Sequence, residues 1–121
     1  MKFSDLNLKI NKEKNITKIE DHEIEVLQYL PIEDKIDLID ITLQKSEENG
    51  TYNEIKLEKY FNLYIVYMYT NLEFTDEEKM NESELYDKLE CSDVFINIIG
   101  AMDENEYKIL YDYLVKMRSL R

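Results

Sequence analysis

The sequence predicts an α+β fold that is mostly helical, with a small N-terminal antiparallel hairpin or meander followed by four to five helices. Apolar residues alternate with polar ones within the first thirty positions, and they recur at helical spacing after Pro31. Only two Gly and one Pro are present, which favours helices joined by short loops over a many-stranded sandwich. Since 44% of the 121 residues are hydrophobic, we expect a single domain, with the strands in residues 1–30 and the helices in residues 31–121.

Short strands are expected in the first thirty residues. Apolar and polar residues alternate over residues 6–10 and again over residues 23–29. Residues 11–15 are expected to form one turn, and Asp21 with His22 occupies the centre of a second. Because a two-stranded ribbon is marginal by itself in water, it must pack on helices or on another protein.

A first helix is expected over residues 32–48. Pro31 suits the opening of a helix, and Gly50 after Asn49 supplies a left-handed end. The apolar stripe recurs at intervals of four, three and four residues: Ile32, Ile36, Ile39 and Leu43.

The helix expected over residues 53–70 is predicted to be the centre of the fold. Asn53 can cap it, and residues 60–69 are apolar nearly all round. Its tyrosines could instead stack nucleic-acid bases, but no groove of Lys and Arg accompanies them. Amphipathic packing, with hydroxyls at the rim of the core, is therefore the favoured interpretation.

Three further segments are predicted after residue 74. Thr75 with Glu78 forms a capping box for a short helix, and Asn81 offers a second cap. Residues 94–99 are expected to form a brief buried apolar turn. Another capping box, Asp103 with Glu106, opens a last helix whose predicted inner face comprises Tyr107, Leu110, Tyr111, Leu114 and Met117.

Residues for catalysis or metal binding are sparse. The one histidine, His22, is expected in an exposed turn, and nothing such as a glycine-rich elbow supports a pair with Cys91. Asp21, His22 and Glu23 could hold a cation, but neighbours in a strand point to opposite faces. No glycine-rich phosphate loop or clustered Cys and His ligands occur. We therefore expect a protein that is not an enzyme and has no cofactor or metal.

The formal net charge of −12 argues against direct binding of nucleic acid, which requires a basic stripe. No apolar stretch approaches the length of a membrane helix. We expect protein partners, and homo-oligomers are compatible with the same features. Binding by strand addition would use Ile24, Val26 and Gln28. The alternative is an acidic surface that imitates phosphates, formed by Asp76, Glu77, Glu78, Glu82, Glu84, Asp87 and Glu90.

Residues 24–35, 52–61 and 69–75 resemble small uncharacterised proteins encoded by bacteriophages and prophages of low-GC Gram-positive bacteria. The resemblance spans about residues 16–89, and its most specific parts are Tyr-Leu-Pro and Tyr-Thr-Asn-Leu-Glu-Phe-Thr. It implies a protein that binds other proteins in virion head or tail assembly, located in the bacterial host cytoplasm or in the virion. The alternative is an inhibitor of a host nucleic-acid enzyme, similar to an anti-CRISPR DNA mimic. The resemblance implies no catalytic residues.

Overall fold

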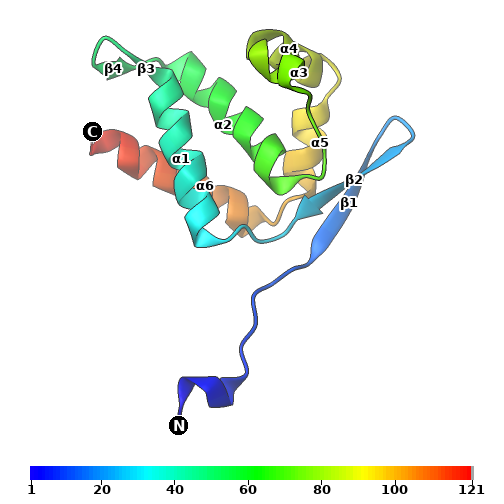
Figure 1. The fold of residues 1–121 in the computed structure, drawn as a ribbon, viewed down its shortest axis with the longest axis vertical. Helices are drawn as coiled ribbons and strands as arrows, with labels where there is room; N and C mark the ends of the chain where they lie inside the picture. Colours follow the sequence, from blue (N-terminus) through cyan, green and yellow to red (C-terminus); the bar gives the residue numbers. More distant parts are fainter. Residues whose placement is uncertain (121) are drawn as a thin grey trace.

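The computed structural model describes residues 1–120 and shows an α+β fold in which a hairpin and helices share one hydrophobic core (Figure 1). The predicted fold class is confirmed. Within the described range no helix combines the length and apolar character that a membrane span requires. The elements in chain order are the 3₁₀ helix η1 (Phe3–Leu6), β1 (Lys14–Ile19), β2 (His22–Leu27), α1 (Ile32–Ser46), β3 (Glu47–Glu48), β4 (Thr51–Tyr52), α2 (Glu54–Tyr69), α3 (Asp76–Met80), α4 (Glu82–Cys91), α5 (Val94–Ala101) and α6 (Glu104–Ser119).

The strand predicted over residues 6–10 does not form, because no described segment pairs with it. β1 and β2 instead make an antiparallel hairpin whose register runs from Lys14 opposite Leu27 to Ile19 opposite His22. The turn lies at Glu20 and Asp21, one position earlier than predicted, and Glu20 adopts the left-handed conformation at φ 56°. Burial fixes this register, because a shift of one residue would turn the buried apolar side chains of β2 toward the solvent.

The buried face of α1 differs from the predicted stripe. Ile32 and Ile36 are 48% and 46% exposed. Ile39 and Leu43 are buried as predicted, and Lys35, Leu38, Thr42 and Ser46 complete the buried face. The hydroxyls of Thr42 and Ser46 are satisfied because each donates to the carbonyl one turn earlier, at 2.8 and 2.7 Å. Polar residues that satisfy themselves in this way are compatible with a core position.

A two-residue strand pair joins α1 to α2. β3 pairs with β4 in antiparallel fashion, so α1 ends at Ser46 and not at residue 48 as predicted. Asn49 and Gly50 take positive φ angles of 52° and 83° in the turn between them. The two helices that this turn connects pack closely against one another (Figure 1).

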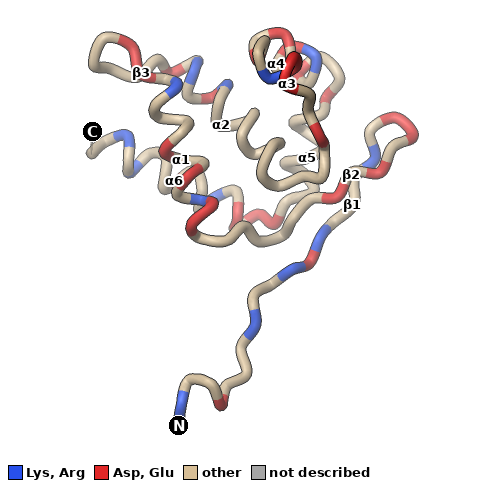
Figure 2. The backbone as a smooth tube through the Cα atoms, in the orientation of Figure 1, with Lys and Arg blue, Asp and Glu red and all other residues tan. Residues whose placement is uncertain are grey.

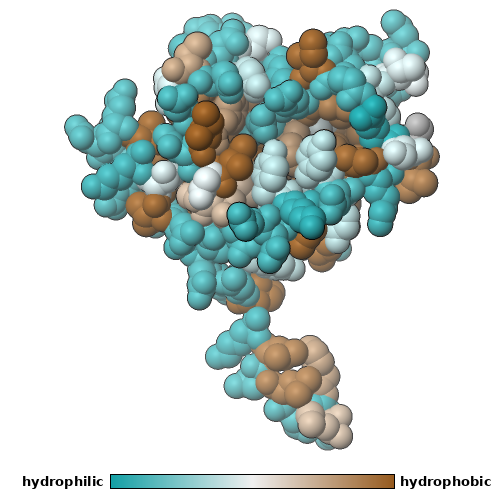
Figure 3. All heavy atoms as spheres, turned by 180° about the vertical axis from the view of Figure 1, so that it is seen from behind, coloured by the Kyte–Doolittle hydropathy of each residue, from teal (hydrophilic) through white to brown (hydrophobic). Residues whose placement is uncertain are grey.

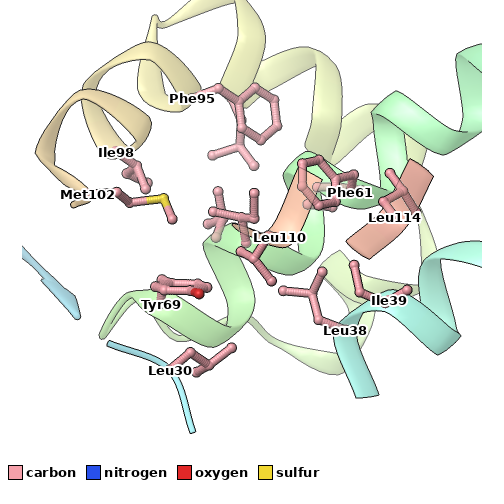
Figure 4. Close-up of a cluster of buried hydrophobic side chains, with 14 of the residues drawn as sticks. Leu30, Leu38, Ile39, Phe61, Tyr69, Phe95, Ile98, Met102, Leu110 and Leu114 are labelled. Atoms are coloured by element: carbon pink, nitrogen blue, oxygen red, sulfur yellow. The ribbon is translucent and has the colours of Figure 1, made fainter. Parts of the chain in front are cut away.

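The central position of α2 is confirmed. Asn53 caps the helix, because its side-chain oxygen accepts hydrogen bonds from the backbone N–H groups of Ile55 and Lys56 at 3.0 and 3.1 Å. The buried residues of α2 lie on more than one face: Leu57, Phe61, Leu63, Ile65, Val66 and Tyr69. Figure 4 shows side chains of α1, α2, α5 and α6 converging on this core.

In the segments after α2, the helix caps agree with the prediction better than the buried residues do. Thr75 and Glu78 form the expected capping box of α3. The apolar turn expected over residues 94–99 is part of the regular helix α5, in which Ile96 is 69% exposed. On α6, Tyr111 is 51% exposed, so it lies at the margin of the predicted inner face, although its ring packs on Phe61.

Glu106 is buried at the centre of a polar network and does not complete the predicted capping box with Asp103. One of its carboxylate oxygens accepts hydrogen bonds from the backbone N–H of Leu30 at 2.8 Å and from the hydroxyl of Tyr69 at 3.1 Å. Its other oxygen lies 3.1 Å from Nζ of Lys35, which is also buried. The network ties the segment after the hairpin to α1, α2 and α6.

Candidate protein-binding surface

The N-terminal arm, defined as residues 1–12, extends away from the rest of the molecule (Figure 1). Every residue of the arm is exposed, including Phe3 at 77%, Leu8 at 67% and Ile10 at 63%. Figure 3 shows apolar side chains gathered at the far end of the arm. None of these side chains joins the core that the described residues form. Apolar side chains held in water away from their own core are typical of an interaction segment.

The arm leads directly into a free strand edge. The backbone N–H of Gln28 donates to the carbonyl of Glu13, so by alternation the backbone groups of Lys14, Ile16 and Lys18 point away from β2. The opposite edge of the hairpin is covered, because Asn71 exchanges two hydrogen bonds with the backbone of Glu25. An exposed edge can pair with an added strand, and Ile16 on this edge is 51% exposed.

Charge divides the arm from the rest of the chain. Residues 1–12 carry Lys2, Lys9 and Lys12 against Asp5, a formal charge of +2, whereas the whole chain carries −12. Residues 13–121 therefore carry −14. Figure 2 shows the basic positions spaced along the arm and acidic positions distributed over the body. An acidic surface on a partner would thus favour binding of the arm.

These three features mark one end of the molecule as its candidate binding surface. No family model, curated protein or solved structure matches this chain. The arm, the free edge and the division of charge are therefore the observations from which a function is inferred.

The residues predicted for strand addition have other contacts. Ile24 and Val26 are buried, 6% and 0% exposed, against the helices of the same chain. Gln28 is half-buried, and its side-chain amide donates to the carbonyl of Ala101 at 2.9 Å and to that of Val26 at 3.1 Å. These residues hold the hairpin on α5. Alternation over residues 6–10 predicts a strand of this fold, so it does not identify the arm as a binding segment.

The predicted acidic surface is present but incomplete. Six of its seven members are exposed: Asp76, Glu77, Glu78, Glu84, Asp87 and Glu90. The seventh, Glu82, is mostly buried and accepts hydrogen bonds from Nζ of Lys45 at 2.6 Å and from the hydroxyl of Tyr67 at 2.9 Å. Lys88 lies 3.2 Å from Glu84. Part of the negative charge is therefore neutralised within the chain.

Glu82 lines a groove between α1, α2 and the α3–α4 segment. The groove has a volume of about 410 Å³ and its lining includes Tyr64, Tyr67 and Met68. Burial, and then the hydrogen bond to Glu82, raise the pKa of Tyr67. Burial alone would lower the pKa of Lys45, but its bonds to Glu82 and Tyr64 outweigh burial and raise it. The bonds of Glu82 to Lys45 and Tyr67 therefore link α4 to both α1 and α2.

We expect stability to fall when the pH rises above about 10, the pKa of an unfolded tyrosine. Burial is the main cause that raises the pKa of Tyr67, Tyr69, Tyr86 and Tyr107 in the folded chain. Above pH ~10 the unfolded state therefore loses these protons before the folded state does, and unfolding is favoured. Tyrosinate absorbance should show these tyrosines ionising only with unfolding. Simultaneous ionisation of all ten tyrosines in a folded chain would contradict this.

The residues considered for chemistry lie on the surface. His22 is exposed at the start of β2, and Cys91 is an exposed free cysteine that ends α4. Over residues 1–120, no group of three or more His, Cys, Asp or Glu side chains is placed to hold a metal ion. Neither residue contributes to the surface formed by the arm and β1.

Proposed function

We propose that the protein is a non-catalytic bacteriophage protein that binds other proteins during virion head or tail assembly, in the host cytoplasm or within the virion. The observation that carries this proposal is the exposed N-terminal arm, with its apolar side chains and free β1 edge. The sequence resemblance of residues 24–35 and 69–75 to phage proteins supports the phage setting.

The arm and the edge support two modes of binding that act together. An extended partner segment can add to β1 and satisfy the backbone groups of Lys14, Ile16 and Lys18. Leu8 and Ile10 can then enter apolar pockets of the partner. Each such side chain contributes about 1.5–3 kcal/mol when it is fully buried, less the cost of ordering the arm.

Photo-cross-linking from position 6, an exposed arm residue that the variants below leave unchanged, followed by mass spectrometry of purified phage particles, tests the proposal. We expect cross-links to a head or tail protein. The variant Leu8→Asp with Ile10→Asp should abolish them and reduce particle yield without lowering the melting temperature, because the arm lies outside the core. Ile96→Asp is the matched control, since Ile96 is an exposed isoleucine on α5. Unchanged particle yield in the arm variant would overturn the proposal.

The second candidate is an inhibitor of a host nucleic-acid enzyme, supported by the six exposed carboxylates of the α3–α4 segment. Salt separates the two, because the Debye length shortens from ~8 Å at physiological ionic strength to ~3 Å at 1 M. An apolar contact of the arm should persist at high salt. A complex that dissociates in high salt, and that is lost when Asp76, Glu77, Glu78 and Glu84 are neutralised, would favour the inhibitor.

A further inference from the structure

An apolar groove lies between α1 and α6, on the part of α1 that the predicted stripe wrongly placed in the core. It encloses about 170 Å³ and is lined chiefly by Ile32, Ile36, Ile39, Tyr113 and Met117. Ile32, Ile36 and Tyr113 are 48%, 46% and 39% exposed. The chain therefore leaves apolar surface uncovered both in this groove and on its arm.

The spacing of the exposed side chains in the arm matches that in the groove. Leu8 and Ile10 are two residues apart in an extended segment, a separation of about 6.7 Å. Ile32 and Ile36 are four residues apart on a helix, a separation of about 6 Å. Two successive arm side chains can therefore pack beside two successive isoleucines of α1.

Charge on the two surfaces is also complementary. Glu33 and Asp40 lie three residues before and four residues after Ile36, and thus on the same side of α1. The charged residues that line the groove itself are Asp40, Lys116 and Lys35, the last of which is paired with Glu106; Asp112 lies one turn before Lys116. In the arm, Lys9 lies between Leu8 and Ile10, and Lys12 follows. The attraction of the basic arm therefore comes from the acidic neighbours of the groove and from the formal charge of −14 on residues 13–121 of the other copy.

We propose that the N-terminal arm of one copy of the chain binds the α1–α6 groove of a second copy. The inference rests on the proposed function, in which the arm is the binding segment. It names a second copy of the chain as the partner whose groove the arm occupies. From β1 the arm extends away from the helices of its own chain, so it can reach a neighbouring copy without folding back (Figure 1). When each of two copies places its arm in the groove of the other, the assembly is closed as a dimer.

Pairing of two β1 edges is a less suitable contact between copies. An antiparallel pair centred on Ile16 would place Lys14 of each copy opposite Lys18 of the other. Like charges directly opposite one another destabilise a strand pair. The edge is thus left for a different partner, and the arm provides the contact between copies.

A disulfide test locates the arm. In the full chain with Cys91→Ser, we would introduce Leu8→Cys and Ile36→Cys together and oxidise at low protein concentration. We expect a disulfide-linked dimer, with position 8 joined to position 36 of the other copy. The matched control pairs Leu8→Cys with Ile96→Cys, and should remain unlinked. A bond within one chain, or no more linkage than in the control, would overturn the inference.

Sedimentation velocity measures the strength of the same contact. Leu8→Asp with Ile10→Asp, and separately Ile36→Asp, should each weaken dimerisation by about 100-fold, since each removes apolar anchors. All three sites are exposed in the single chain, so circular dichroism should show intact folds. A parent chain that stays monomeric at high concentration, or a dimer that both variants preserve, would exclude the exchange.

The outcomes also separate this inference from the proposed function. If the parent is monomeric but the arm variant still loses its cross-links to virion proteins, the inference fails and the proposed function stands. If the copies dimerise through the arm but no virion protein is cross-linked and particle yield is unchanged, the proposed function fails and the exchange stands.

Discussion

Glu106→Ala is expected to destabilise the fold by about 3–5 kcal/mol, the largest effect of any single substitution considered. The carboxylate accepts hydrogen bonds from the backbone of Leu30 and from Tyr69, and it lies 3.1 Å from Nζ of Lys35. The substitution leaves Lys35 as a buried charge without its partner and deprives two further donors of their acceptor. Urea denaturation, followed by circular dichroism, measures the change.

Two further variants show whether the buried charge is the cause. Glu104→Ala removes an exposed carboxylate from the same turn of α6 and should change stability by no more than ~0.5 kcal/mol. Glu106→Gln with Lys35→Met removes both charges but keeps an acceptor for Leu30 and Tyr69, and should recover most of the loss. Equal unfolding midpoints for Glu106→Ala and Glu104→Ala would contradict the network.

Truncation of Phe61 or Ile65 to Ala should cost about 2–5 kcal/mol in each case. Both side chains are buried, 3% and 0% exposed, on the central helix α2. Phe61 also packs at ring-centroid distances of 5.9 Å from Tyr107 and 6.4 Å from Tyr111 of α6. Each truncation leaves a cavity whose lining loses contacts, because the helices cannot fully close it.

Ile55→Ala is the matched control for these truncations. Ile55 lies in the first turn of the same helix but is 79% exposed, so its truncation should change stability by no more than ~0.5 kcal/mol. The comparison uses thermal and urea unfolding of the three variants. If Phe61→Ala and Ile65→Ala unfold with the parent and the control, α2 is peripheral.

Local chemistry accounts for the elements that were predicted well. Asn53, Thr75 and Asn81 each bind the N–H groups at the start of the helix they precede, as their side chains dictate wherever a helix follows. The central place of α2 followed from the apolar character of residues 60–69, since a helix that is apolar nearly all round must be enclosed.

The predictions that failed depended on distant partners. Lys35 is inside and Ile36 is outside because Glu106, 71 residues further along, supplies a buried anion. Spacing alone cannot reveal such a partner, so it predicts the core positions of Ile39 and Leu43 correctly but those of Ile32 and Ile36 wrongly. Likewise, alternation over residues 6–10 is a local pattern, but a strand requires a second strand, and the described chain supplies none there.

The same limit applies to the candidate binding surface. Apolar, exposed Leu8 and Ile10 look the same in the sequence as Ile24 and Val26, which are buried. Only the tertiary contacts of the hairpin with α5 distinguish the segment that completes this fold from the segment left available to a partner.

The point at which the arm is anchored determines how far it reaches and how it bears a mechanical load. Asn15 and Gln28 both donate to the carbonyl of Ala101, at 3.0 and 2.9 Å, so the root of the arm is fastened to the end of α5. The seven peptide units from Leu8 to Asn15 span at most about 25 Å when extended. A partner held at Leu8 is therefore kept within that distance of the anchor, and tension on it passes along the backbone into β1, where the ladder with β2 and the bond from Asn15 to Ala101 resist it together.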